Sequence, residues 1–269
     1  MWIQADVKSI SQMQEYSQQD LHGKDVINPG DGACNQKGCC IYTEEKLKLN
    51  ESGVGLRNVD LMVFDFDGTL VDSGGDIAAS VNHTLKMLGI PEKETDTIMH
   101  YIGDGVQKLI EKSIGPDGGD RYQEAMEIFS SHYARHMLDT TTLYHSVIET
   151  LSHFQEKKKI VITNKRKYFT LKIAESLGLT EYFEEIIGAD STPYKKPDPR
   201  LLHPVIERYH SASDKTIVIG DGINDILLAK NAGVQSCALL NGLTRRDILL
   251  SLNPDFCCED ISELKNLFR

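Results

Sequence analysis

The chain has 269 residues, of which 40% are hydrophobic and 26% are charged, so it can bury a sizeable core and hold one large or two modest domains. Lys and Arg number 29 against 40 Asp and Glu, which gives a net charge of -11. A surface this acidic repels nucleic acid and anionic lipid, so neither is an expected partner. A phosphate group can bind only where a metal ion, amide groups and a few cations override that field.

No stretch approaches the roughly 20 apolar residues that span a bilayer, and the first residues lack the basic and apolar regions of a signal peptide. We therefore expect a cytoplasmic protein. The six cysteines include two adjacent pairs, which fits reduced thiols better than a disulfide framework. Cys34, Cys39 and Cys40 lie close together but lack the spacing of a zinc site, so a structural metal there is the less favoured interpretation.

Residues 1–57 are polar, without sustained apolar periodicity, and form an N-terminal extension whose role the sequence does not indicate. At Val59 the pattern changes to a short apolar run that predicts a buried strand ending in a tight polar loop. Comparable runs lie at 159–164, 184–190, 216–222 and 234–240, with helical segments at about 167–177, 198–210 and 223–232 between them. This alternation predicts an α/β fold with a doubly wound, Rossmann-like parallel sheet, formed by residues 58–72 and 146–269.

The first two predicted strands are separated by residues 72–158, far more than one crossover helix requires. We therefore expect an inserted domain at residues 73–145. Its apolar residues recur at helical spacing, which predicts a small helical cap over the carboxyl edge of the sheet, where open α/β sheets bind ligands. The stripes are Ile77, Val81, Leu85 and Leu88; Val106, Leu109 and Ile110; and Tyr122, Ala125, Ile128 and Phe129.

Polar segments at the predicted strand ends should converge on one crevice. They are Asp65-Phe66-Asp67-Gly68-Thr69-Leu70, Thr163-Asn164, Lys195-Lys196-Pro197-Asp198-Pro199 and Gly220-Asp221-Gly222-Ile223-Asn224-Asp225. The first loop can aim one carboxylate at phosphorus and the other at a leaving oxygen, and its glycine lets the backbone approach a phosphate. A Thr hydroxyl with the following amides can hold phosphate oxygens, and a lysine supplies positive charge.

Magnesium prefers an octahedral set of oxygens and keeps several waters, so a few carboxylates suffice to bind it. Asp65, Asp221 and Asp225 meet that need. The ion would cancel the repulsion between Asp65 and a dianionic phosphate, which is the main obstacle to a carboxylate nucleophile. We therefore expect the site to be nearly inert without Mg²⁺.

In order and spacing, the segments DFDGTLVDS, VITN, KKPDP and GDGIND resemble motifs one to four of the haloacid dehalogenase superfamily, over about residues 59–240. The likeness is greatest to phosphoglycolate phosphatases, which carry a helical cap after motif one. YIGDGVQKLI at 101–110 is similar to the cap loop that faces substrate there. Tyr144-His145-Ser146 departs from the family, since a proline-glycine turn is more usual at that position.

This resemblance implies a magnesium-dependent phosphatase that hydrolyses a small phosphomonoester, best guessed as 2-phosphoglycolate, through an aspartyl phosphate. The implied catalytic residues are Asp65 as nucleophile, Asp67 as general acid and base, and Lys196 as the stabilising cation. The implied substrate-binding residues are Gly68, Thr163, Asn164, Gly103, Asp104 and Gly105, and the implied metal residues are Asp65, Asp67 through its carbonyl, Asp221 and Asp225.

Several alternatives stay open. A sugar phosphomutase uses the same four motifs and returns the phosphoryl group to a sugar. A non-enzymatic regulator would be expected to lack Asp65 or Asp67, and both are present. A dehalogenase would not need the second acid. The cap loop can also be read as a simple helix start with Asp104 as its N-cap.

Three further expectations concern packing and motion. The hinges of a closing cap should be Ser73-Gly74-Gly75 and residues 140–146, since a covalent intermediate must be shielded from water. Lys157-Lys158-Lys159 is interpreted as a solvated helix end. The nine histidines are interpreted as surface or packing residues, because they show no paired spacing with acids or cysteines.

Overall fold

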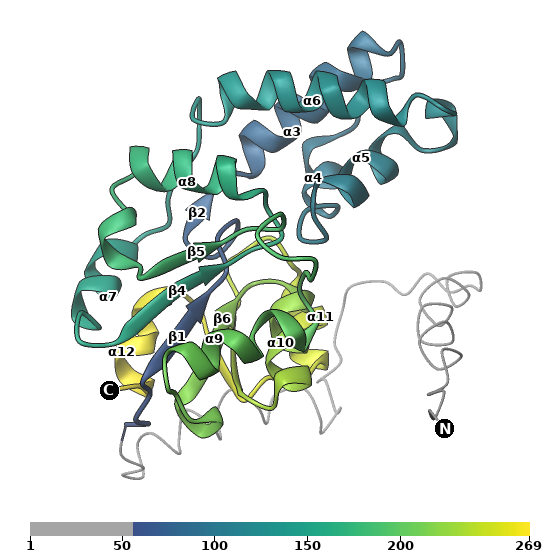
Figure 1. Ribbon diagram of the computed structural model, residues 1–269. Coiled ribbons are helices and arrows are strands. Elements are labelled where there is room, and N and C mark those ends of the chain that lie inside the picture. Colours follow the sequence, from purple (N-terminus) through teal and green to yellow (C-terminus); the bar gives the residue numbers. More distant parts are fainter. Residues whose placement is uncertain (1–55) are drawn as a thin grey trace, which may run out of the picture. The chain divides into compact units, whose positions relative to one another are not determined.

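The computed structural model describes residues 56–269, and Figure 1 shows these as coloured ribbons. Expectations for residues 1–55, including Cys34, Cys39 and Cys40, lie outside the described residues. Six parallel strands form the central sheet in the order β5-β4-β1-β6-β7-β8, which confirms the predicted doubly wound α/β class. The strands are β1 Leu61–Phe64, β4 Lys158–Ile162, β5 Glu185–Ile187, β6 Thr216–Gly220, β7 Gln235–Leu239 and β8 Phe256–Cys258.

The central strand β1 is apolar on both of its faces. All four of its residues are buried, and it pairs in parallel with β4 on one side and β6 on the other. Because side chains alternate along a strand, Met62 and Phe64 enter one core cluster while Leu61 and Val63 enter the other. A strand that packs against helices on both faces must be continuously hydrophobic, which is the pattern in the sequence.

Helices cover the sheet, and two of the three predicted ones match closely. The covering helices are α7 Val147–His153, α8 Lys167–Ser176, α9 His203–Arg208, α10 Ile223–Ala232, α11 Arg246–Ser251 and α12 Leu264–Leu267. Helix α10 ends at Gly233, whose φ of 69° is the left-handed conformation expected of a terminating glycine. The helix predicted at 198–210 is instead a 3-10 turn at Pro199–Leu201 followed by α9. Pro204 has no N–H to continue a helix and is tolerated only in a first turn, so the segment divides there.

Four helices lie between two short strands that pair with each other. Strands β2 Val71–Asp72 and β3 Thr142–Leu143 are antiparallel, and the chain between them forms α3 Gly74–Met87, α4 Thr95–Met99, α5 Val106–Ile114 and α6 Tyr122–His136. Helices α3 and α6 pack against each other beyond the sheet (Figure 1). Most of the predicted apolar stripes are buried, whereas Val106, Tyr122 and Ile128 are half-buried. The domain boundaries at 73 and 145 remain predictions.

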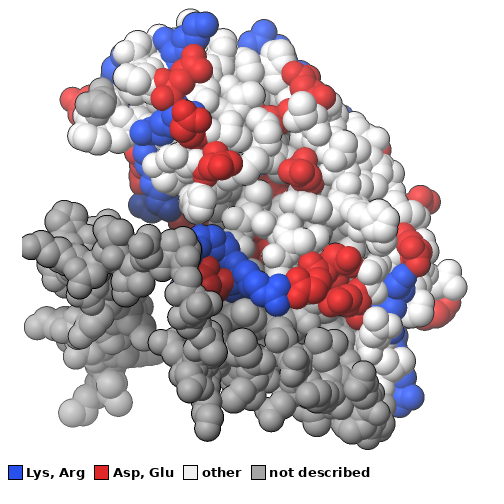
Figure 2. All heavy atoms as spheres, turned by 180° about the vertical axis from the view of Figure 1, so that it is seen from behind, with Lys and Arg blue, Asp and Glu red and all other residues white. Residues whose placement is uncertain are grey.

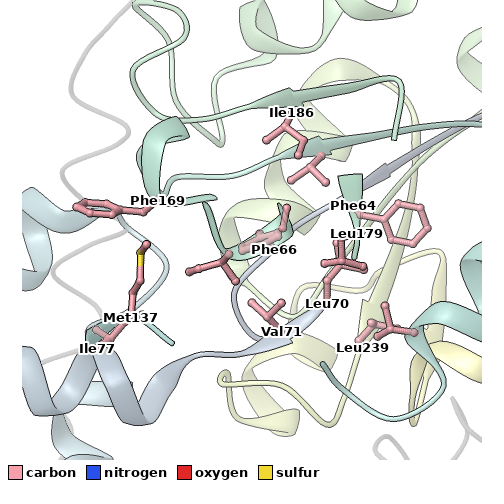
Figure 3. Packing of buried hydrophobic residues seen from close by; sticks show 14 of the residues in the cluster. Phe64, Phe66, Leu70, Val71, Ile77, Met137, Phe169, Leu179, Ile186 and Leu239 are labelled. Carbon is pink, nitrogen blue, oxygen red and sulfur yellow. The ribbon is translucent and has the colours of Figure 1, made fainter. Parts of the chain in front are cut away.

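One apolar cluster joins these helices to the sheet. Figure 3 shows Ile77 of α3, Met137, which follows α6, and Phe169 of α8 in the same buried cluster as Phe64 of β1. The rings of Tyr133 and Phe169 also meet edge to face, with centroids 5.1 Å apart. The helical segment is therefore seated on the sheet by continuous hydrophobic packing as well as by the two connecting strands.

Lys159 departs from the prediction of a solvated helix end. It belongs to β4 and is 4% exposed, and its Nζ donates to the carbonyl oxygens of Phe154 at 2.6 Å and Lys157 at 3.2 Å. The aliphatic stem packs in the core while the ammonium satisfies the carbonyl oxygens at the end of α7 and in the turn that follows it. The edge strand β8 also escaped prediction, because Phe256–Cys258 is too short to show a period.

Other described side chains agree with the expectations. Cys237 and Cys258 are buried free thiols. His83, His132 and His136 stack in series along α3 and α6, with ring centroids 4.0 and 4.2 Å apart, so they are packing residues.

Charge is interspersed on the face drawn in Figure 2, where acidic and basic side chains lie near one another between broad uncharged areas. Within residues 56–269, no helix is long and apolar enough to cross a membrane.

Candidate active site

The ends of the central strands bring the predicted polar segments together around one cavity of about 240 Å³. Asp65 directly follows β1, Thr163 follows β4 and Asp221 follows β6. Of the predicted site residues, Gly68 does not line the cavity. The others that line it are Asp65, Asp67, Gly103, Asp104, Gly105, Thr163, Asn164, Lys196, Asp221 and Asp225.

Three carboxylates gather at the bottom of this cavity beside a buried lysine. Asp65, Asp221 and Asp225 each place an oxygen within 4.8 Å of the other two. Lys196 Nζ lies 2.7 Å from Asp65 Oδ1 and 2.6 Å from Asp225 Oδ1, and its side chain is 2% exposed. One buried lysine thus faces several acidic groups, and the cluster carries excess negative charge when all three are ionised.

The electrostatics of the cluster favour a further cation. Burial raises the pKa of Asp221 to about 7, and the charge of Asp65 adds to the effect. The pKa of Asp225 is raised for the same two reasons. Burial lowers the pKa of Lys196, but the charges of Asp225 and Asp65 outweigh it and raise the pKa above its ordinary value. Clustered carboxylate oxygens are the donors that Mg²⁺ prefers, so the residues present fit that ion.

Asp221 is oriented by hydrogen bonds to both of its carboxylate oxygens. Thr69 Oγ1 donates to Asp221 Oδ1 at 2.7 Å, and the Leu243 N–H donates to Oδ2 at 2.7 Å. Gly68 allows its backbone to lie close to the Asp221 carboxylate, because a Cβ at this position would lie 2.2 Å from Asp221 Oδ2. The structure therefore explains Gly68 by its close packing against an acidic residue and by its φ of 86°, rather than by a place in the cavity wall.

Asp67 lies apart from that cluster and has its own partners. Its Oδ1 accepts a hydrogen bond from Ser73 Oγ at 2.5 Å, and Lys165 Nζ donates to both carboxylate oxygens, at 2.9 and 3.1 Å. Lys165 also donates to the hydroxyl of Tyr133 of α6 at 2.7 Å. The second carboxylate is thus tied to a lysine of the core and, through it, to the inserted helices.

Lys165 and Tyr133 were not among the predicted site residues. Lys165 directly follows the VITN segment, so its position at a strand end was a signal available in the sequence. Tyr133 lies in a helical stripe that resembles plain core packing, and only the docking of α6 on the sheet brings it to the cavity.

Asn164 uses its side-chain amide to connect backbone segments. Its Nδ2 donates to the Gly103 carbonyl oxygen at 2.9 Å and to the Lys196 carbonyl oxygen at 3.2 Å, while its Oδ1 accepts from the Lys196 N–H at 3.0 Å. The Asn164 amide therefore connects the loop that carries Lys196 to the cap loop that contains Gly103. Thr163 keeps its hydroxyl hydrogen available, since its Oγ1 accepts from the Lys165 N–H at 3.1 Å.

The interpretation of Asp104 as a simple helix N-cap is wrong. Helix α5 has Gly105 at its N-cap position, without a side-chain cap, and the Asp104 carboxylate bonds elsewhere. Asn224 Nδ2 donates to Asp104 Oδ1 at 2.9 Å, and Lys112 Nζ donates to Oδ2 at 3.0 Å. A Cβ at Gly105 would lie 3.1 Å from the Asn164 carbonyl oxygen, so the cap loop packs closely against the loops at the strand ends.

The fold and the site together define an α/β protein with three clustered carboxylates beside a buried lysine at the strand ends. The sequence model of one family, described as haloacid dehalogenase-like hydrolase, matches residues 62–239, and the chain belongs to that family. The predicted family and hydrolase class are confirmed.

Similar proteins cover nearly the same part of the chain. A phosphoglycolate phosphatase of Vibrio parahaemolyticus is 32% identical over 217 residues, which are 77% of this chain and 95% of that protein. One from Colwellia psychrerythraea is 34% identical over 218 residues, 78% of this chain and 96% of that protein. A crystal structure described as a predicted phosphoglycolate phosphatase of Haemophilus somnus superposes with a TM-score of 0.73 at 27% identity, covering 78% of this chain and 98% of its own.

Proposed function

We propose that this protein is a magnesium-dependent phosphatase that hydrolyses a small phosphomonoester through phosphorylation of Asp65, with 2-phosphoglycolate as the first substrate to test. The observation that carries the proposal is the contact of Asp65 with Lys196, 2.7 Å apart, within a cluster of three carboxylates at the strand ends. The phosphoglycolate phosphatases among the similar proteins support the choice of substrate.

In the first step, a carboxylate oxygen of Asp65 attacks phosphorus and the bond from phosphorus to the leaving oxygen breaks. A proton passes from the Asp67 carboxyl group to that oxygen, so the alcohol departs neutral. In the second step, Asp67 takes a proton from water, and the water oxygen attacks phosphorus. The bond to Asp65 breaks, inorganic phosphate is released and both side chains return to their starting forms.

Other groups support these steps by position and charge. Lys196 offsets the negative charge of Asp65 and Asp225 while a dianionic phosphate approaches. The Thr163 hydroxyl is placed to donate to a phosphate oxygen, and Asn164 acts by holding the loops around the phosphate. A Mg²⁺ ion held by Asp65, Asp221, Asp225 and the carbonyl of Asp67 would supply further positive charge at the phosphate.

Release of inorganic phosphate from a panel of small phosphomonoesters, with Mg²⁺ and with a chelator, tests the proposal. We expect turnover of 2-phosphoglycolate with Mg²⁺ and almost none with the chelator. Asp65→Asn should abolish turnover, because no covalent route remains. Asp60→Asn is the matched control, since Asp60 is exposed and precedes β1 at the opposite end of that strand.

Two results would contradict this function. One is a wild-type protein that releases no phosphate from any ester of the panel in the presence of Mg²⁺. The other is an Asp65→Asn variant that retains turnover. A sugar phosphomutase would reveal itself by converting one sugar phosphate into another without releasing phosphate.

A further inference from the structure

Lys165 is a buried cation in the cavity wall to which the proposed reaction assigns no task. Its side chain is 7% exposed, and its Nζ contacts both oxygens of Asp67 and the hydroxyl of Tyr133. The ammonium also lies 4.7 Å from the centroid of the Tyr133 ring. A lysine loses hydration and side-chain freedom when it is buried in this way, and both losses oppose folding. We therefore looked for a binding role for Lys165.

The other cations at the cavity are differently placed. Lys196 lies between Asp65 and Asp225 and already has a task in the proposed reaction. Arg245 and Lys112 have side chains 63% and 41% exposed, and each forms an ion pair, while Arg166 is also exposed. Among the described residues that line the cavity, Lys165 is thus the buried cation beside Asp67. An anion gains more from a buried cation than from a solvated one, because water screens the attraction less.

The position of Lys165 relative to Asp67 indicates which part of a substrate it would meet. Asp67 acts on the leaving oxygen in the proposed reaction, and Lys165 Nζ lies 2.9 Å from Asp67 Oδ1. A group attached to the carbon next to the leaving oxygen is only two covalent bonds from that oxygen. A carboxylate there would lie close to Asp67, which becomes charged once it has given its proton to the leaving oxygen, and Lys165 is the buried cation that contacts Asp67.

We propose that Lys165 binds an anionic substituent of the leaving group, and that this site therefore selects small phosphomonoesters that carry a carboxylate next to the ester carbon. This specificity rests on the proposed phosphatase function. Tyr133 holds the ammonium in place from α6, so the docked helical segment completes the selective site.

The test compares two substrates of the same skeleton, 2-phosphoglycolate and 2-hydroxyethyl phosphate, which carries an alcohol in place of the carboxylate. The wild type should prefer 2-phosphoglycolate in kcat/KM. Lys165→Gln keeps a polar side chain but removes the charge, and it should lower kcat/KM for 2-phosphoglycolate by about 10- to 100-fold. It should change kcat/KM for the alcohol much less, and Lys165→Arg should keep part of the preference.

Two neighbouring residues make the comparison specific. Lys167→Gln removes the same charge from an exposed position outside the cavity wall, so the substrate preference should stay at its wild-type value. Arg166 is exposed and does line the cavity, which makes it the competing receptor. If Arg166→Gln removed the preference while Lys165→Gln kept it, the assignment to Lys165 would be overturned.

An equal loss on both substrates in Lys165→Gln would also overturn the proposal, because Lys165 would then serve Asp67 instead of the substrate. The proposal would also be overturned if the wild type showed no preference between the two esters, and that measurement does not depend on whether a variant folds. Calorimetric binding of both esters to the wild type in the presence of a chelator, where almost no turnover is expected, separates this inference from the function. If neither ester were hydrolysed, the proposed phosphatase function would fail, and carboxylate selection by Lys165 would still stand or fall on the affinity difference.

Discussion

Asp65 and Asp67 lie two positions apart in the sequence and end in different surroundings. Asp65 faces Lys196 at the bottom of the cavity, whereas Asp67 is held by Ser73 and Lys165 on the side of the inserted helices. A carboxylate nucleophile needs a nearby cation that reduces its repulsion of the phosphate, and a general acid and base needs access to the leaving oxygen. The two environments therefore fit the two roles proposed for these residues.

Asp67→Asn tests the task of the second carboxylate. Asparagine keeps the size and the backbone carbonyl but can neither give nor take the proton, so turnover of an alkyl phosphate should fall by about 10² to 10⁴. With an aryl phosphate, whose leaving group needs little protonation, the first step should partly recover and phosphorylated Asp65 should accumulate. Mass spectrometry of the quenched enzyme detects that adduct. Label on another residue, or near wild-type turnover of the alkyl ester, would refute the mechanism.

Gly68→Ala tests the close packing beneath the residues proposed to bind Mg²⁺. The new Cβ would meet Asp221 and would also sit at a φ of 86°, so we expect weaker Mg²⁺ activation of phosphate release and a loss of about 1–2 kcal/mol or more in the free energy of unfolding. Gly89→Ala is the control, because Gly89 has a φ of 69° and nothing within 4 Å of its ideal Cβ. It should show the backbone cost alone. Unchanged Mg²⁺ dependence in Gly68→Ala would contradict this account.

Among the elements, the base of α3 is tied to the chain leading into β3 by one carboxylate. Asp76 is 2% exposed and accepts hydrogen bonds from the backbone N–H and the hydroxyl of both Thr140 and Thr141, at 2.6 to 3.1 Å. Asp76 directly follows the first segment predicted as a hinge, and Thr140 and Thr141 lie in the second. Movement of the cap about those hinges remains a prediction, and Asp76 is the contact that would have to persist or break during it.

Asp76→Asn should lower the free energy of unfolding by about 2–3 kcal/mol, since hydrogen bonds to a charged group are the stronger kind. Burial raises the pKa of Asp76, but the bonds from Thr140 and Thr141 outweigh it and leave the pKa below its ordinary value of 3.8. The contribution is therefore complete above that value and is lost as the pH falls through the lower, folded-state pKa. Denaturant unfolding measures both effects, and Asp72→Asn, at an exposed position in β2, is the control. Equal stability of the two variants would show that the contact is unimportant.

At the scale of the whole molecule, the chain from Arg57 to Val59 is bonded to the C-terminal residues. The Arg57 N–H donates to the Leu267 carbonyl oxygen at 2.8 Å, and the Arg269 N–H donates to the Arg57 carbonyl oxygen at 2.9 Å. Val59 is fully buried. The start of the described chain and its C-terminal end therefore hold each other beside the sheet.

A protein that starts at Gly55 should keep the turnover of the full chain, because every proposed catalytic residue lies after Val59 and these terminal contacts survive. A protein that starts at Leu61 should be less stable, since it loses the backbone bonds of Arg57 and the burial of Val59. Phosphate release and thermal melting of the two proteins provide the comparison. Loss of turnover in the longer protein with its fold intact would assign residues 1–54 to the reaction.

The sequence by itself determined the parallel sheet, the polar motifs at the ends of its strands and the acidic site. Continuous apolar runs predict buried strands because both faces of a parallel sheet are covered, and parallel strands that end in polar residues place those residues at one edge. That reasoning was sufficient for Asp65, Asp221 and Lys196, each of which lines the cavity.

Only the tertiary structure decided how the inserted helices meet that edge. Tyr133 reaches Lys165, and Asp104 reaches Asn224, through contacts between residues 32 and 120 positions apart. No local period encodes such contacts, because they depend on the way one apolar surface docks on another. The same holds for Gly68. A side chain at this position would collide with Asp221, which lies at the end of a different strand.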